Sequence, residues 1–438
     1  MISHQKQREI MDALRRGTVP CQGLDHLAVG LQRFERAVDE SLASVKSGGS
    51  QFKAVRGEYG SGKTFFARWL QERAKGQGFA TAEVQISETE TPLHRLETVY
   101  RRLMERLSTA NAQTGAFRGI IDGWFYALEE DVIAAGSASS SDEAALLRET
   151  NALMEQRLQN VAKQAPAFAA ALRGYRQAIA QGDSVVADGL IAWLSGQPNV
   201  AASVKRFASI KGDVDHFGAL SFLQGLLVIL RDSGHAGLIV TMDEVETLQR
   251  MRGDVRDKAL NALRQLMDEV DAGRFPGLYV LITGTSSFFD GPQGVQRLPP
   301  VAQRLHVDFT TEPRFDNPRA VQVRLPGFDL ASLCELGDKI RDLFCEHSPN
   351  AERIRALAND DYIACFAKAV TGTLGGKVGI APRLFLKKLV GEVLDRIDQF
   401  PDFDPRRDYK LTVTDKDMSP IERNAASAGS VDEIEISL

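Results

Sequence analysis

The sequence predicts an α/β fold in which a parallel sheet is covered by helices on both faces. Short, almost wholly apolar runs recur along the 438-residue chain and alternate with amphipathic helical patterns, as is typical of parallel strands buried on both sides. A glycine-rich loop at 57–64 follows one of these runs, and two acidic residues at 243–244 end another. We therefore expect one sheet whose strands carry the polar, functional residues at their carboxyl ends.

Composition and charge indicate an ordinary folded protein. Hydrophobic residues make up 43% and charged residues 25%, the proportions of a globular protein. The length allows two or three domains, or one large core with additions. A net charge of −5 gives no overall nucleic-acid footprint, so any such surface would have to be a local patch.

Cysteines and apolar runs indicate a cytoplasmic protein without a membrane segment. The four cysteines show no CxxC spacing and suit free thiols in a reducing cytosol rather than zinc or disulfide sites. The start of the chain lacks the apolar core of a signal peptide. The most apolar run, at 222–230, is too short to span a bilayer.

The expected elements divide the chain into four parts. Residues 1–48 form an N-terminal helical segment, and residues 49–325 form the sheet-containing core. Residues 326–400 are expected to form a C-terminal helical lid. Residues 401–438, rich in Pro, Asp and Ser, are expected to be an extension and a disordered tail. The expected strands of the core lie at 52–55, 80–86, 237–242, 277–283 and 320–325.

A large helical insertion interrupts the core from about residue 95 to residue 232. This region is rich in Ala, Leu, Glu and Arg and holds few strand candidates. The segment GSASSSD at 136–142 predicts a mobile loop within it. No internal repeat is present, and the sequence does not indicate what the insertion does.

The strongest functional signal is the segment GEYGSGKT at 57–64. It matches the GxxxxGK[ST] pattern in the strand–loop–helix context that the pattern requires. Glycines let successive backbone N–H groups point at phosphate oxygens, and the helix N-terminus adds the positive end of its dipole. Lys63 can reach the β- and γ-phosphates, and the Thr64 hydroxyl can bind Mg²⁺. A glycine-rich turn with a chance lysine is the disfavoured alternative. The predicted nucleotide-binding residues are Gly57, Glu58, Tyr59, Gly60, Ser61, Gly62, Lys63, Thr64 and Phe65.

The second signal is the run LIVTMDE at 238–244, a buried strand that ends in two carboxylates. We expect Asp243 to hold Mg²⁺, directly or through water, and Glu244 to polarise the attacking water. An apolar strand that ends in Asp-Glu by chance is the alternative. The long gap between the two motifs is explained by the helical insertion.

The next strand ends in TGTSS at 283–287. If the strand pairs with both motif-bearing strands, a polar residue at its end can hydrogen-bond the γ-phosphate or the lytic water, as a sensor-1 residue does. Thr283 and Thr285 are the candidates, and the sequence does not separate them. The alternative is a Ser/Thr-rich turn without a role.

Two arginines are candidates for contacting phosphate from elsewhere. Arg304, near the end of a short helix, can project at a neighbouring subunit's nucleotide, or it is a surface arginine or an intrachain ion pair. Arg383 lies in the first turn of a helix that begins near Pro382, where a cation opposes the helix dipole. A bound phosphate would compensate, which favours a sensor-2 role.

Together these segments resemble the AAA+ branch of P-loop ATPases, near its origin-recognition and STAND-like relatives. More narrowly, the flanking segments resemble the BrxD family of BREX-system ATP-binding proteins. The segments that carry the broader resemblance are GEYGSGKT at 57–64, LIVTMDE at 238–244, ITGTSS at 282–287, AQRL at 302–305 and APRLFL at 381–386. Those that carry the narrower one are LRRGTVP at 14–20, LAVG at 27–30, VRGEYGSGKTFF at 55–66 and RLPGF at 324–328.

The resemblance implies an AAA+-type three-layer core in which ATP, rather than GTP, lies between core and lid. It places 23–30 near the adenine and implies a homo-oligomer, as a ring or filament. It further implies a bacterial phage-defence component that works with a methyltransferase, a phosphatase-like protein and a helicase. Too little ordered sequence is expected after Arg383 for the complete winged helix that origin-binding relatives carry, which argues against direct sequence-specific DNA binding and leaves other DNA contact open.

Three functions are compatible with the phosphate-loop motif. The first is an ATPase that remodels or loads partner proteins on DNA, with slow hydrolysis in the monomer and faster hydrolysis in the oligomer. The second is a nucleotide-dependent switch or scaffold with little turnover. The third, a P-loop kinase, is disfavoured by the Asp243–Glu244 pair and by Arg383.

Overall fold

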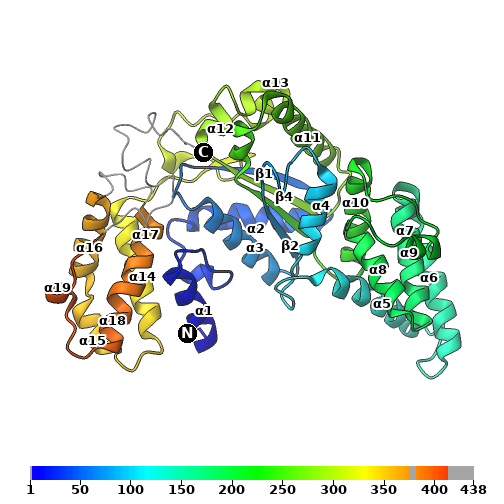
Figure 1. The fold of residues 1–438 in the computed structure, drawn as a ribbon, viewed down its shortest axis with the longest axis horizontal. Coiled ribbons are helices and arrows are strands. Elements are labelled where there is room, and N and C mark those ends of the chain that lie inside the picture. Colours follow the sequence, from blue (N-terminus) through cyan, green and yellow to red (C-terminus); the bar gives the residue numbers. More distant parts are fainter. Residues whose placement is uncertain (1, 374–380, 413–438) are drawn as a thin grey trace.

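The computed structural model describes residues 2–373 and 381–412. A parallel sheet lies in the middle of the molecule, with the helical insertion on one side and the C-terminal helices on the other (Figure 1). All the strand pairs are parallel, and the strands run in the order β2-β3-β4-β1-β5. The strands are β1 (Gln51–Arg56), β2 (Ala80–Gln85), β3 (Leu238–Asp243), β4 (Leu278–Gly284) and β5 (Gln322–Arg324).

The sheet is buried on both faces, as the apolar runs predict. Alternate residues of β3 belong to different hydrophobic cores: Val240 and Met242 pack with the insertion side, and Ile239 packs with the opposite side. Each strand therefore needs apolar residues at successive positions, which explains the continuous runs in the sequence. The prediction of a mixed α/β protein with a covered parallel sheet is confirmed.

Helices cover the two faces of the sheet. The face toward which Ile239 points is covered by α2 (Gln32–Lys46) and α3 (Lys63–Gly76). The other face is covered by α4 (Leu96–Glu105), α10 (His216–Asp232) and α11 (Gly253–Asp271). The shorter elements of the core are η1 (Leu24–His26), η2 (Val245–Arg250), α12 (Ser286–Asp290), η3 (Val295–Arg297), α13 (Pro299–Leu305) and η4 (Pro313–Phe315).

The insertion is helical, as expected, and shares one hydrophobic core with the sheet. Trp124 is fully buried and donates its indole N–H to Asp232 at 2.6 Å. One isolated bridge, between Thr81 and Ser108, ties the insertion to β2. Besides α4 and α10, its helices are α5 (Ala116–Ala134), α6 (Glu143–Gln164), α7 (Pro166–Ala180), α8 (Ser184–Leu194) and α9 (Ala202–Phe207).

The C-terminal helices form a second hydrophobic core, separate from that of the sheet. They are α14 (Leu330–Cys345), α15 (Ala351–Leu357), α16 (Asp360–Thr373), α17 (Ala381–Lys388), the π-helical turns η6 (Leu389–Leu394), α18 (Asp395–Gln399) and α19 (Pro405–Asp408). The region expected to form the lid is mostly helical from Leu330 to Gln399 in its described residues, which leave out 374–380. Of the predicted extension and tail at 401–438, residues 413–438 lie outside the described residues.

The N-terminal segment is shared between the two cores. Helix α1 (His4–Arg15) places Ile10 and Leu14 in the C-terminal core, whereas α2 packs on the sheet. Between them the chain is held on α3, because the Glu72 carboxylate accepts the backbone N–H groups of Gly23 and Leu24 at 2.6 and 2.7 Å. The N-terminal segment therefore contacts both cores, and the predicted domain boundaries stay predictions.

Two further observations concern membrane-spanning helices and the cysteines. Within residues 2–373 and 381–412, no helix has the length and apolar character needed to cross a membrane. The four cysteines are free, with Cys345 buried and Cys21 and Cys365 exposed.

Candidate nucleotide site

The glycine-rich loop runs from the end of β1 to the start of α3. Gly60 and Gly62 have φ values of 79° and 89°, which side chains other than glycine rarely adopt. A Cβ at Gly57 would lie 2.3 Å from the Ser61 hydroxyl oxygen, which is itself buried without a partner in the described structure. The loop therefore needs its glycines, and it leaves a polar atom available to a ligand.

Lys63 is buried at the start of α3 and folds back over the loop. Its ammonium donates to the carbonyl oxygens of Gly57 at 2.9 Å and Glu58 at 3.2 Å, and it lies 5.2 Å from the centre of the Tyr59 ring. Carbonyl oxygens are weaker partners for a cation than phosphate oxygens are. The ammonium would therefore gain by exchanging them for a phosphate.

The two sequence motifs meet at Thr64 and Asp243. The Thr64 hydroxyl donates to one carboxylate oxygen of Asp243 at 2.7 Å, across a sequence separation of 179 residues. The backbone N–H of Glu244 donates to the other oxygen at 3.1 Å. A hydroxyl and a carboxylate side by side are oxygen ligands of the type Mg²⁺ takes alongside phosphates and waters.

Strand β4 lies between β1 and β3, as the sensor-1 hypothesis requires. Thr283 is fully buried and its hydroxyl donates to Asp243. Thr285 follows the strand and exchanges a hydrogen bond of 3.0 Å with Ser287. The structure therefore gives the two threonines different partners: Thr283 supports a carboxylate, and Thr285 belongs to the loop. Which of them senses phosphate stays a prediction.

Glu244 has an unusual backbone and a partner that the sequence analysis missed. Its φ is 58°, in the left-handed region that is costly for a non-glycine residue. Gln85, the last residue of β2, donates its amide to the Glu244 carboxylate at 2.6 Å. Because β2 pairs with β3 in register, with Gln85 opposite Asp243, a polar residue at the end of β2 was a usable signal.

Glu246 is a second residue that the sequence analysis missed. It is only 5% exposed, and neither carboxylate oxygen has a hydrogen-bond partner in the part of the chain that the structure describes. Burial raises the pKa of Glu246 to about 7, opposed by the charge of Lys63 and reinforced by Glu244 and Asp243. A third acidic residue three positions after Asp243 was the available signal.

The two arginine candidates lie elsewhere. Arg304 forms an ion pair with Asp268 of α11 within the same chain, the alternative that the sequence left open, and its side chain stays 39% exposed. Arg383 is exposed on α17, and its guanidinium lies beside Gly17, where a Cβ would be 3.5 Å from Nη1. A role for either arginine at a nucleotide stays a prediction.

No group of three or more His, Cys, Asp or Glu side chains with the geometry of a metal site occurs in residues 2–373 and 381–412. A magnesium site of the expected kind does not need one. Mg²⁺ usually keeps several waters and binds one or two protein ligands together with substrate phosphates. Thr64 and Asp243 fit that pattern.

A family described as "BREX system ATP-binding protein BrxC/D" matches residues 2–413, nearly the whole chain. No curated protein and no solved structure matches.

Proposed function

Since the chain belongs to the BREX system ATP-binding protein BrxC/D family, we propose that it binds and hydrolyses ATP as part of a BREX phage-defence system. We further propose that its core is of the AAA+ type. The strand order β2-β3-β4-β1-β5 supports this, because it inserts one strand between the two that carry the nucleotide motifs.

One observation carries the proposal. Two motifs 179 residues apart in the sequence come within one hydrogen bond of each other, at Thr64 and Asp243. Chance motifs in a chain of this length would have no reason to meet at the carboxyl-end edge of one parallel sheet, where α/β proteins bind ligands.

The residues have separate roles in the proposed reaction. The loop N–H groups and Lys63 bind the phosphates of ATP, and Thr64 and Asp243 hold Mg²⁺. Bound Mg²⁺ supplies positive charge that offsets the charge of the phosphates. Glu244 orients the attacking water and accepts its proton, once its carboxylate leaves Gln85.

A specific test is ATP turnover by wild type and by Glu244→Gln. If Glu244 is the base, the variant keeps ATP affinity and loses roughly a hundredfold or more in turnover. Glu88→Gln, an exposed carboxylate after β2, controls for the loss of one charge. Wild-type turnover in Glu244→Gln would refute the assignment.

A second candidate function is a nucleotide-dependent switch or scaffold with little turnover. The Gln85–Glu244 hydrogen bond favours it, because it occupies one oxygen of the carboxylate that would have to orient the attacking water. In that case ATP would drive assembly without being consumed. Glu244→Gln would then leave the protein active in defence, whereas a hydrolysis-driven protein would lose activity.

The proposed partners rest on the family and on Arg304. Other components of the defence system, such as the helicase, methyltransferase or phosphatase-like protein, are the proposed partners. Arg304 is the proposed residue that completes a neighbouring subunit's site in a homo-oligomer, after leaving Asp268. DNA contact is proposed only through these partners.

A further inference from the structure

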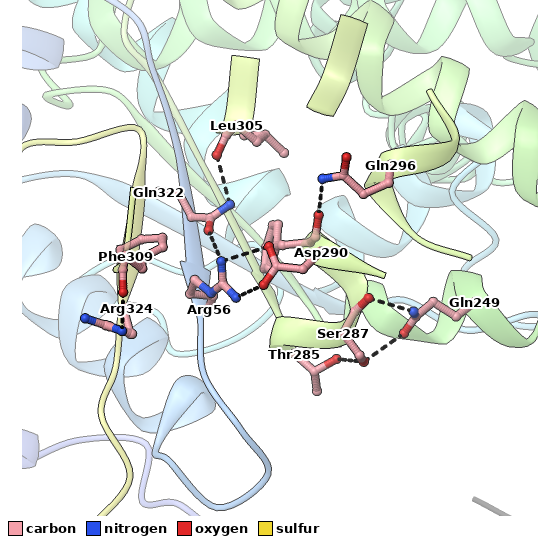
Figure 2. Close-up of polar contacts among 11 residues, drawn as sticks. Arg56, Gln249, Thr285, Ser287, Asp290, Gln296, Leu305, Phe309, Gln322 and Arg324 are labelled. Atoms are coloured by element: carbon pink, nitrogen blue, oxygen red, sulfur yellow. Dashed lines mark hydrogen bonds and ion pairs between the residues drawn. The ribbon is translucent and has the colours of Figure 1, made fainter. Parts of the chain in front are cut away.

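Arg56 is the last residue of β1 and stands immediately before the glycine-rich loop. Its side chain is only 10% exposed. Nη1 donates to one carboxylate oxygen of Asp290 at 3.1 Å, and Nη2 donates to the other (Figure 2). Two parallel hydrogen bonds of this kind fix both the distance and the orientation of the carboxylate.

Asp290 ends α12, the short helix that follows β4. The start of the same helix is held from the other side, where Gln249 donates its side-chain amide to the Ser287 carbonyl at 3.0 Å. The Thr285 and Ser287 hydroxyls, 3.0 Å apart, lie at this start (Figure 2). Gln249 and Arg56 therefore hold the two ends of the segment after β4, which runs from the sensor-1 candidate Thr285 to Asp290.

The same guanidinium reaches a third element. Nη1 also donates to the Gln322 side-chain oxygen at 3.1 Å. Gln322 in turn donates its amide to the carbonyl of Leu305 at 3.0 Å (Figure 2). Leu305 is the last residue of α13 and follows Arg304. Arg56 therefore connects the beginning of the phosphate loop, the loop after β4 and the end of α13.

Stability does not account for this arrangement. Burying a guanidinium is costly, and a buried ion pair often adds little to folding stability. Here the Asp290 side chain is 62% exposed, so water weakens the pair. The Nε of Arg56 is buried and has no hydrogen-bond partner among the described residues. The contacts specify a geometry more than they stabilise the fold.

We propose that Arg56 is a positioning residue that fixes the loop after β4 against the phosphate loop, and thereby lets the site distinguish ATP from ADP. The inference deepens the proposed function and rests on it. ADP binding depends on the phosphate loop itself, so it does not need Arg56. The response to the γ-phosphate, in contrast, depends on the placement of Thr285 and Ser287, and therefore it does need Arg56.

Arg324 provides a matched control. It lies opposite Arg56 in the β1–β5 register and makes its own bidentate pair, with both contacts to Asp316 at 2.9 Å. Both guanidinium groups lie near the Phe309 ring, 4.9 Å from its centre for Arg56 and 5.1 Å for Arg324. The Arg324 contacts hold the segment before β5 and do not reach α12.

The experiment compares wild type with Arg56→Lys, Asp290→Asn, the double variant and Arg324→Lys. Turnover is measured with Mg²⁺–ATP, and affinities are measured for ADP and for a non-hydrolysable ATP analogue. Lysine keeps the charge but cannot make the paired contact. We expect turnover and the analogue-to-ADP affinity ratio to fall about tenfold in both single variants, with ADP affinity unchanged. The double variant should be no worse than the more severe single variant.

Two results would overturn the proposal. One is an unchanged affinity ratio and turnover in both single variants, and the other is an equal loss in Arg324→Lys, which would indicate a merely structural effect. If Arg56→Lys does not fold, Asp290→Asn decides, because its side chain is mostly exposed. If the wild-type chain binds ATP but does not turn it over, only the proposed hydrolysis is refuted. The analogue-to-ADP affinity ratio then still decides the role of Arg56.

Discussion

Replacement of Glu246 by Gln should make folding stability less dependent on pH. Burial raises the pKa of Glu246 from 4.5 to about 7, so the folded chain keeps a proton there that the unfolded chain has released. Stability therefore falls as the pH rises between these values, and the penalty is complete above about pH 7. A gap of this size corresponds to about 3 kcal/mol. Gln has nearly the same shape and no charge, so it removes the penalty.

The assay is thermal or denaturant unfolding of Glu246→Gln and wild type from about pH 5 to about pH 8.5. The stability of the variant relative to wild type should rise by about 2.5 kcal/mol across this range, because the unfolded chain has already released most of the Glu246 proton at pH 5. Glu88→Gln, at an exposed position, should show no such trend. A difference that stays constant with pH, or that favours wild type at high pH, would refute the placement of Glu246 as a buried, unpaired carboxyl.

Three other predictions concern the nucleotide site. Lys63→Ala should reduce ATP affinity at least a hundredfold, because phosphates lose their cation; calorimetry that shows wild-type affinity would refute the site. Gln85→Ala should release Glu244 and raise basal turnover about fivefold, since a hydrogen bond to an exposed charged group is worth about 1 kcal/mol; lower turnover would show that Gln85 assists catalysis instead. Arg304→Ala should slow turnover only at protein concentrations where subunits assemble, and an equal loss in a verified monomer would exclude a role in a neighbour's site. The same variant should also free Asp268, with little effect on stability because the pair is partly exposed.

The sheet and the proximity of its two polar motifs could be predicted because their signals are local. A strand buried on both faces must be apolar at successive residues, and β3 and β4 are. Residues at and after the carboxyl ends of parallel strands meet at one edge of the sheet, and there Thr64, in the first turn of α3, lies within hydrogen-bond distance of Asp243 at the end of β3. In such cases a short stretch of sequence carries the whole argument.

The contacts that the sequence did not reveal depend on partners far along the chain. In the sequence, Arg56 is an ordinary residue at the end of a strand. Its partner Asp290 lies 234 residues away along the chain, and only the folded structure brings the two together. The amphipathic pattern of α1 shows that one face is buried but not that Ile10 packs with the C-terminal helices. Glu246 looks like a solvated acid in the sequence, and only the packing around η2 removes its water.

The measurement that bears most directly on the central claim is ATP affinity with and without Mg²⁺, for wild type and Asp243→Asn. Asn keeps the shape of Asp243 and can still hydrogen-bond Thr64, but it removes the charge that would hold the metal. If Thr64 and Asp243 hold Mg²⁺ beside the phosphates, Mg²⁺ strengthens ATP binding in wild type and has little effect in the variant. An equal Mg²⁺ effect in both proteins would contradict the account.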